Sequence, residues 1–189
     1  MTLDQLKQQL AGEWISIAPE LRPSGSKNAD GSLKPFYLTR RFTYSAEDIF
    51  ALEIINFADA YGQIPLANIK LKGHISWQGE HPIIMGAQQV DFTASQAYDV
   101  TPLHPAFIDI LNKVATDGYD AWQLNTSQSV FQKAFLPFGL TQGQLFKEYD
   151  LIFVQNNLMF WGARHVDGRG FDTPENRPTN LQIPLIRRA

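Results

Sequence analysis

The chain has 189 residues, a formal net charge of −3 and no cysteine, which suits one domain over residues 1–189 with a substantial core. These features exclude disulfides, zinc–thiolate sites and thiol nucleophiles, and they give no electrostatic footprint for nucleic acid. No apolar run approaches the ~20 residues of a membrane helix, and the first ten residues lack the apolar centre of a signal peptide, so we expect a cytoplasmic protein that does not span a membrane.

A short amphipathic helix is predicted at the N-terminus. Leu3, Leu6 and Leu10 share one helical face, Thr2 with Gln5 resembles a capping box, and a glycine follows at position 12. We expect this helix to cover one end of a barrel. A first strand is predicted over residues 13–17.

The segment 19–35 is predicted to be mostly loop, because proline and glycine recur along it. Residues 36–44 and 49–57 follow as strands. In the first of these, alternation places Arg40 on the same face as Phe and Leu side chains, where an unpaired charge is costly. Arg40 therefore needs either a ligand anion or an internal carboxylate, for which Glu13, Glu53 and Asp91 are the candidates.

The strand predicted over residues 67–77 has the clearest pattern in the chain. Its odd positions are apolar apart from Gly73, and its even positions are polar, which is typical of a strand with one buried and one solvated face. Gly73 on the buried face indicates a bend, a bulge or a close approach of two backbones.

The second half of the chain is predicted to continue as strands around one inserted helix. We expect a turn at 79–82, a strand over 83–93, and a helix near 101–116 with Thr101 as N-cap and Pro102 at the first helical position. Residues 134–143 suit a lid or a bent strand, and 155–157 a tight hairpin turn. Four further strands are predicted at residues 121–127, 145–154, 158–163 and 181–186.

About eight strands result, the number at which an antiparallel barrel closes around side chains or one small ligand. The predicted fold is therefore mainly β: a barrel of about eight antiparallel strands with an N-terminal helix and one inserted helix. No internal repeat or domain linker interrupts it.

No strong catalytic, metal or cofactor signature is present. The histidines lack metal-ligand spacing; His74 is expected in solvent, and His81 and His104 in turns or caps. His165, at a strand end beside the Gly-rich loop 168–179, is the most site-like. Asp91 is expected to be an exposed strand carboxylate, or a base if it is buried.

Several motifs resemble the repeated extracellular domain of the adenomatosis polyposis coli down-regulated protein family, whose members are secreted or membrane-tethered inhibitors of Wnt signalling. The resemblance covers nearly the whole chain and is least clear over about 116–145. It rests on Gly-Glu-Trp-Ile-Ser at 12–16, Glu-Leu-Arg-Pro at 20–23, Tyr-Leu-Thr-Arg-Arg-Phe at 37–42, Gly73, Met85-Gly86, Val-Thr-Pro-Leu at 100–103 and the tail at 172–185.

This resemblance implies a lipocalin-like, calycin-type β-barrel that holds a hydrophobic or acyl ligand. The chain departs from the family in having a single copy of the domain and no cysteines, and Ala18 stands where a family cysteine follows the Trp-Ile-Ser segment. Wnt antagonism therefore does not transfer.

We expect binding of a hydrophobic small molecule or lipid in a barrel pocket, without a cofactor, a metal or a catalytic residue. Two alternatives stay open. One is an isomerase, cyclase or lyase that uses Arg40, Asp91 or His165 in the same pocket. The other is an interaction protein whose barrel is filled by its own side chains. The expected ligand-contacting residues are Trp14, Leu38, Arg40, Phe42, Leu71, Ile75, Trp77 and His165.

Overall fold

In the computed structural model, which describes residues 2–45 and 47–188, the chain is mainly β with two α-helices. All strand pairings are antiparallel. The strands are β1 (Gly12–Ser16), β2 (Glu20–Lys27), β3 (Leu33–Ser45), β4 (Ile49–Phe57), β5 (Pro65–Glu80), β6 (Gln88–Pro102), β7 (Gln128–Ser129), β8 (Lys147–Gln155), β9 (Leu158–Trp161) and β10 (Leu185–Arg187).

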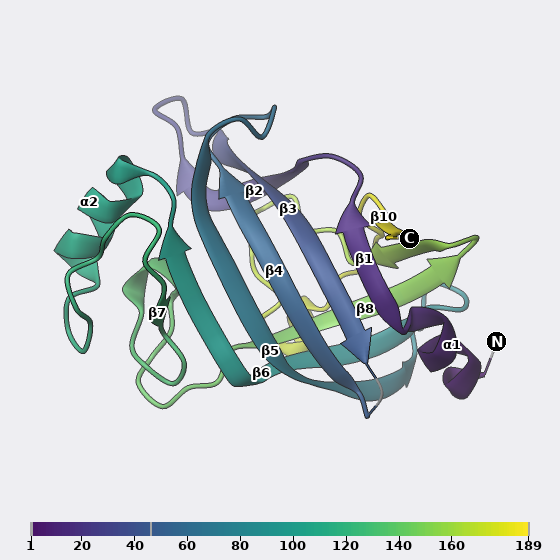
Figure 1. The fold of residues 1–189 in the computed structure, drawn as a ribbon. Coiled ribbons are helices and arrows are strands. Elements are labelled where there is room, and N and C mark those ends of the chain that lie inside the picture. Colours follow the sequence, from purple (N-terminus) through teal and green to yellow (C-terminus); the bar gives the residue numbers. More distant parts are fainter. Residues whose placement is uncertain (1, 46, 189) are drawn as a thin grey trace.

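Eight of these strands form a closed ring (Figure 1). Its order is β1-β10-β9-β8-β6-β5-β4-β3, and β1 closes it by pairing with both β10 and β3. Strand β2 pairs with the first half of β3 outside the ring, and β7 is a two-residue addition to β6. The predicted mainly β, antiparallel fold with a count of about eight strands is confirmed at this level.

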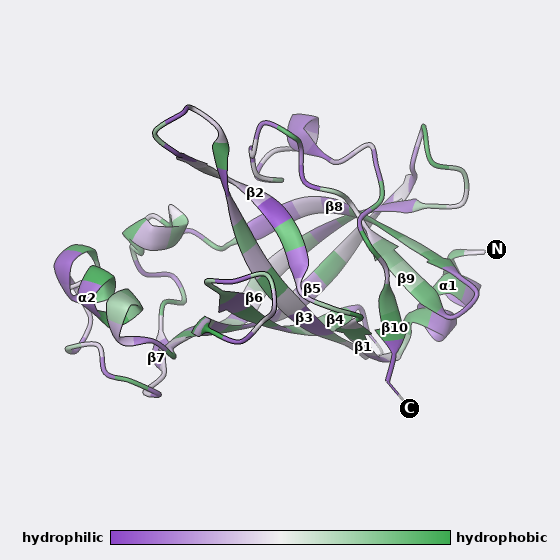
Figure 2. Ribbon diagram, turned by 90° about the horizontal axis from the view of Figure 1, so that it is seen from above, coloured by the Kyte–Doolittle hydropathy of each residue, from purple (hydrophilic) through white to green (hydrophobic). Residues whose placement is uncertain are grey.

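Two helices lie at opposite ends of the strands (Figure 1), and the second, with the chain that follows it, lies to one side of them (Figure 2). Helix α1 (Leu3–Leu10) has the predicted capping box between Thr2 and Gln5, and it buries Leu6 and Leu10 in the core of the ring. Neither α-helix among the described residues has the length and apolar character needed to cross a bilayer.

Helix α2 (Pro105–Val114) begins later than predicted. Strand β6 keeps pairing with β5 as far as Pro102, so the chain leaves the sheet only after that residue. His104 is the N-cap, and its Nδ1 accepts from the Ala106 N–H at 3.2 Å. The expected N-cap at Thr101 is wrong because cross-strand pairing overrides the local helix-start signal.

Two further predictions about the strands are wrong. Residues 20–27 form β2 instead of a loop; Pro23 is tolerated there because β2 pairs only with β3 and is an edge strand. Residues 121–127 form no strand. Trp122 is instead fixed against α2, where its backbone N–H donates to Asn112 at 2.8 Å and its indole N–H to Ala115 at 2.7 Å.

Gly73 marks the predicted close approach of two backbones. A Cβ at this position would lie 1.8 Å from the carbonyl oxygen of Thr93 on β6, and the β5–β6 register shifts between Lys72 and His74. The missing side chain lets β5 and β6 bend tightly against each other.

Aromatic side chains fill the half of the ring that α1 covers. Phe42 lies at the centre, and its ring centroid is 4.1 Å from that of Trp161 and 5.7 Å from that of Phe92. Phe50 makes an edge contact with Phe92 at a centroid distance of 5.2 Å. Such contacts add to the free energy gained by burying these large apolar surfaces. This half of the ring is a packed core.

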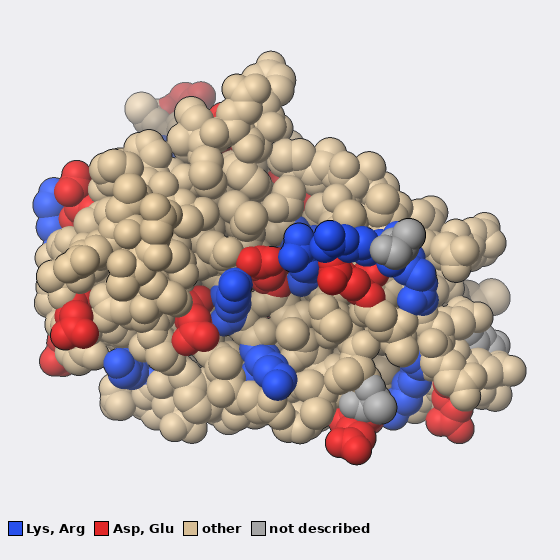
Figure 3. Space-filling view, in the orientation of Figure 1, with Lys and Arg blue, Asp and Glu red and all other residues tan. Residues whose placement is uncertain are grey.

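The outer face of the sheet carries a row of alternating charge that crosses several strands (Figure 3). Glu53 on β4 lies between Lys70 and Arg41, at 3.7 and 3.6 Å. Glu13 on β1 lies between Arg41 and Arg188, at 3.5 and 2.8 Å. Exposed pairs of this kind contribute about 0–1 kcal/mol each, so the row mainly favours the observed strand register.

Candidate functional site

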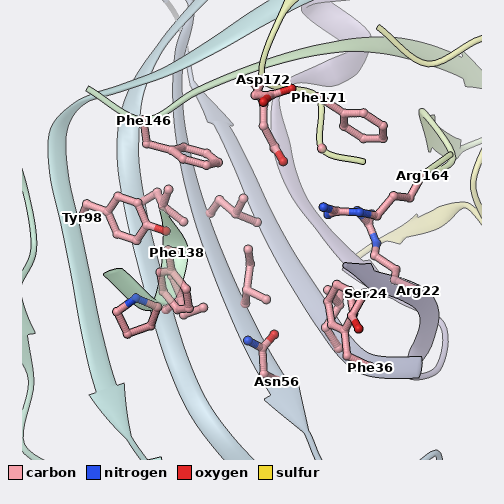
Figure 4. A pocket seen from close by; sticks show the side chains of 18 of the residues that line it. Arg22, Ser24, Phe36, Asn56, Tyr98, Phe138, Phe146, Arg164, Phe171 and Asp172 are labelled. Atoms are coloured by element: carbon pink, nitrogen blue, oxygen red, sulfur yellow. The ribbon is translucent and has the colours of Figure 1, made fainter. Parts of the chain in front are cut away.

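A cavity of about 500 Å³ lies in the half of the ring away from α1, and Figure 4 shows the side chains that line it. Its volume is within the ~300–1,000 Å³ range of small-molecule sites. The strands that build the aromatic core also build this cavity, because each strand passes through both halves. On β3, for example, Phe42 lies in the core and Leu38 at the cavity.

One wall of the cavity is apolar. It is formed by inward-facing residues of four neighbouring strands, β3 to β6, at alternate positions along each strand. Aromatic rings extend it where Tyr98 packs on Phe146 at 5.5 Å and on Phe138 at 6.2 Å. Phe138 comes from the short helix η1 (Leu136–Phe138), within the segment expected to be a lid or a bent strand. The aliphatic wall residues are Leu38, Leu52, Ile54, Ile69 and Leu71.

The opposite side of the cavity is polar (Figure 4). Arg22 and Ser24 reach it from β2, and Arg164 reaches it from the chain after β9. Two carboxylates also line the cavity, Glu148 at the start of β8 and the exposed Asp172. Phe36 and Phe171 lie among these polar groups (Figure 4). The cavity is therefore amphiphilic, with an aliphatic wall on one side and charged groups beside two aromatic rings on the other.

A group of buried charged side chains, Glu20, Arg22 and Arg40, adjoins the polar side of the cavity. Glu20 on β2 binds Arg40 on β3 through two bonds, from Nε and Nη2, both 2.9 Å long. Arg40 also stacks on Trp161, 4.7 Å from the ring centroid. Burial by itself would raise the pKa of Glu20, but the charges of Arg40 and Arg22, together with hydrogen bonds from Arg40 and Ser16, hold this pKa below its usual range.

Arg22 is less well satisfied than Arg40. It is 6% exposed, its closest carboxylate oxygen is on Glu20 at 3.5 Å, and its Nε has no hydrogen-bond partner. Burial, and then the neighbouring charge of Arg40, lower the pKa of the Arg22 guanidinium. The charges of Glu20, Glu148 and Asp150 act in the opposite direction. Among these carboxylates only Glu20 makes a direct ion pair with the described cations, and Arg40 and Arg22 share it.

Arg164 is the second guanidinium at the cavity. Its Nε donates to the Gly168 carbonyl at 3.1 Å, and its charged end lies 5.9 Å from the Phe36 ring. No described carboxylate lies within ion-pairing distance of it. A ligand oxyanion is the natural partner of such a group.

Asp150 is a buried carboxyl on the inner side of β8, outside the cavity lining. Its Oδ1 accepts from the backbone N–H groups of Leu151 at 2.7 Å and Gly162 at 2.9 Å, and its Oδ2 has no partner. Burial, and then the charge of Glu148, raise the pKa of Asp150 to about 7. This carboxyl therefore titrates near neutral pH.

The structure brings two of the predicted ligand-contacting residues to the cavity, Leu38 and Leu71. Three others, Trp14, Phe42 and Ile75, are packed in the core below it. Ligand contact by these residues stays a prediction. What the structure adds is that one half of the ring interior is filled and the other half is open.

The remaining three predicted contacts are engaged with protein groups. Arg40 is internal and ion-paired, but its partner is Glu20 and none of the three carboxylates expected, because the sequence predicts a loop where β2 lies. Trp77 donates to Asp48 at 2.8 Å. His165 binds the Asn176 carbonyl through Nε2 at 3.0 Å and does not line the cavity.

The polar groups expected to serve an enzyme do not meet in the cavity. Asp91 is buried and held by Arg177 at 2.6 Å and Lys147 at 3.1 Å. Arg40 and His165 are held as described above. Among the other histidines, His74 is exposed as predicted, and His81 is buried in a turn, where its Nδ1 accepts two backbone N–H groups.

Sequence reasoning missed Arg22 and Arg164. Alternation along residues 20–24 would have placed Arg22 beside Glu20 on one face, had the segment been recognised as a strand. Arg164 adjoins His165, and the guanidinium, not the imidazole, reaches the cavity.

No group of three His, Asp or Glu side chains suited to a metal ion occurs within residues 2–45 and 47–188. The apolar wall and the arginines of the cavity are features that suit an organic ligand. A scan of the sequence against models of known protein families finds no match.

Proposed function

We propose that this protein binds a hydrophobic or acyl, lipid-like small molecule in the cavity of the ring. The observation that carries the proposal is the apolar wall formed by four consecutive strands around about 500 Å³ of open space. Apolar side chains facing open space favour a ligand that removes them from water, at about 0.8 kcal/mol per buried methylene. Burial of about ten methylenes would then supply the ~8 kcal/mol that corresponds to micromolar affinity.

Two further points support the same class of ligand. The resemblance to the adenomatosis polyposis coli down-regulated protein family implies a lipocalin-like barrel with an acyl ligand, and we extend that barrel type to this closed ring as part of the proposal. The packed aromatic core beneath the cavity makes the wall rigid, which lowers the conformational cost of binding. The cytoplasmic location stays a prediction.

Adjacent residues on β4 offer a matched test. Ile54 faces the cavity, whereas Ile55 faces the outer side of the sheet. We expect the fluorescence of the uncharged probe N-phenyl-1-naphthylamine to rise on binding the wild-type protein and to fall when 1-dodecanol displaces it. Ile54→Trp should fill the cavity and abolish this signal, and Ile55→Trp should retain it.

Denaturing mass spectrometry of the purified protein gives an independent readout, because a tightly held apolar ligand would be released on unfolding. Equal probe binding by the two tryptophan variants would contradict the proposal. So would the absence of both a co-purified apolar compound and probe binding to the wild type.

A further inference from the structure

The polar side of the cavity has an unbalanced set of buried charges. Glu20 carries one negative charge, and Arg40 takes both of its oxygens in bonds of 2.9 Å. Arg22 approaches the same carboxylate only to 3.5 Å and keeps an unpartnered Nε, although it is 6% exposed. A buried charge without a full set of partners is costly, so binding of an anion beside Arg22 would lower the free energy of the site.

Arg164 places a second guanidinium on the same side of the cavity as Arg22, opposite Tyr98 and Phe138 (Figure 4). It donates to one backbone carbonyl and leaves its remaining N–H groups available to a ligand. Lys147 also lines the cavity, but its ammonium is held by Asp91 at 3.1 Å. The arginines are therefore the cations available to a ligand.

Resting on the proposed function, we propose that Arg22 and Arg164 bind the oxyanion head group of an amphiphilic ligand whose hydrocarbon tail lies along the apolar wall of strands β3 to β6. A guanidinium presents paired N–H groups that match the oxygens of a carboxylate or a phosphate. The ligand class is thus a fatty acid or a long-chain alkyl phosphate, and a neutral lipid is disfavoured. Ser24 also lines the cavity, but its hydroxyl donates to the Ser26 carbonyl at 3.3 Å, so the two arginines carry the recognition of the head group.

Glu148 sets a limit on this arrangement. It lines the same cavity, as the exposed Asp172 also does, and it makes no ion pair with the described cations, so it repels a ligand anion. Removing its charge should therefore strengthen binding of the anion. Removing either arginine should instead weaken binding of the anion. Variants that strengthen and variants that weaken binding therefore both test whether these charges act on the head group.

The experiment compares three ligands with the same tail, namely dodecanoate, dodecyl phosphate and 1-dodecanol, by calorimetric titration at pH 8. We expect at least one of the two anions to bind wild-type protein ten-fold or more tightly than the alcohol. Whichever anion binds more tightly identifies the head group. Arg164→Met and Arg22→Met should each reduce the ratio of anion to alcohol affinity toward one, and Glu148→Gln should increase it. Lys113→Met, on the exposed side of α2, is the control that keeps the wild-type ratio.

Arg22 is buried, so replacing it with methionine can prevent folding. Arg164 is only half-buried, so the Arg164→Met protein is expected to fold and provides the decisive test. Equal affinities of anion and alcohol for the wild type would overturn this inference and leave the proposed function standing. An unchanged ratio in Arg164→Met would overturn it as well. No binding of any of the three ligands would overturn the proposed function together with it.

Discussion

Glu20 on β2 and Arg40 on β3 form a buried, bidentate ion pair with both bonds at 2.9 Å. The pair joins the one long strand outside the ring to its interior, and it leaves Arg22 directed at the cavity with an incomplete set of partners. The Glu20 carboxylate therefore both stabilises the fold, through Arg40, and determines how many partners Arg22 has at the cavity.

Removing the charge of Glu20 should destabilise the fold more than removing Arg40. Glu20→Gln leaves two buried guanidinium groups without a carboxylate, and we expect a loss of about 3–5 kcal/mol in the free energy of unfolding. Arg40→Met leaves Glu20 available to Arg22, so a smaller loss is expected. Urea unfolding of both variants at pH 7 measures the difference, and the reverse order would contradict this account.

Gly73→Ala should destabilise the protein by about 1–3 kcal/mol or more, because the added methyl group meets the Thr93 carbonyl oxygen at 1.8 Å. The matched control is Gly170→Ala, where the nearest atom to a Cβ is 3.6 Å away and belongs to a side chain. Thermal unfolding of the two variants separates a general effect of alanine from this contact. A Gly73→Ala protein as stable as the wild type would rule out the close approach.

Asp150 should make stability depend on pH. Because burial raises its pKa to about 7 in the folded protein, the folded state keeps a proton that the unfolded state loses near pH 4. The stability that this proton contributes is fully present below about pH 4, and it is lost as the pH rises through about 7.

Asp150→Asn keeps the Oδ1 acceptor for Leu151 and Gly162 and removes the titration. Relative to wild type, this variant should therefore gain stability between pH 4 and pH 7, with a slope of at most about 1.4 kcal/mol per pH unit. Urea unfolding across pH 4–8 measures it, with the exposed Asp109→Asn on α2 as the control. A constant difference from wild type at all pH values would count against a buried, titrating Asp150.

Arg177 should hold the segment 162–180 against the sheet. Its Nη1 donates to the carbonyls of Val90 at 2.7 Å and Asp150 at 2.5 Å, and its Nη2 donates to Asp91 at 2.6 Å. Lysine cannot reproduce this planar set of bonds, so Arg177→Lys should cost about 1–3 kcal/mol.

The change at Arg177 should also be local. Hydrogen exchange should speed up at the Tyr149 amide, which donates to the Phe171 carbonyl at 2.7 Å within the same region. Arg169→Lys, at an exposed position of the segment, serves as the control. Unchanged exchange at Tyr149 in Arg177→Lys would show that the segment is held by other contacts.

The parts of the fold that were predictable are those where one residue pattern dominates. Strand β4 has the predicted bounds, and the alternation over 67–77 lies within the longer β5. Asn156 and Asn157, both at positive φ, form the predicted hairpin turn between β8 and β9, where asparagine tolerates the left-handed conformation. In each case the local preference and the tertiary structure agree.

The parts that were missed depend on partners distant in sequence. Pro23 suggests a loop unless the chain is known to lie on a sheet edge beside β3. The start of α2 depends on how far along the chain β6 stays paired with β5. The open half of the ring depends on which inward-facing side chains meet across its interior. The aliphatic wall was partly predictable from strand faces. Arg22 was not, because β2 was predicted to be a loop, and Arg164 was not, because it lies in the chain after β9, where no regular pattern shows which side chain faces the cavity.

Strand β10 is three residues long, yet it is the element that joins β1 to β9. Proteolysis before Leu185 would leave both neighbours with unpaired backbone groups along their edges, and exposed edges of this kind pair readily with other chains. We expect the intact protein to remain dispersed and the clipped form to self-associate, so that resistance to aggregation depends on the last few residues of the sheet.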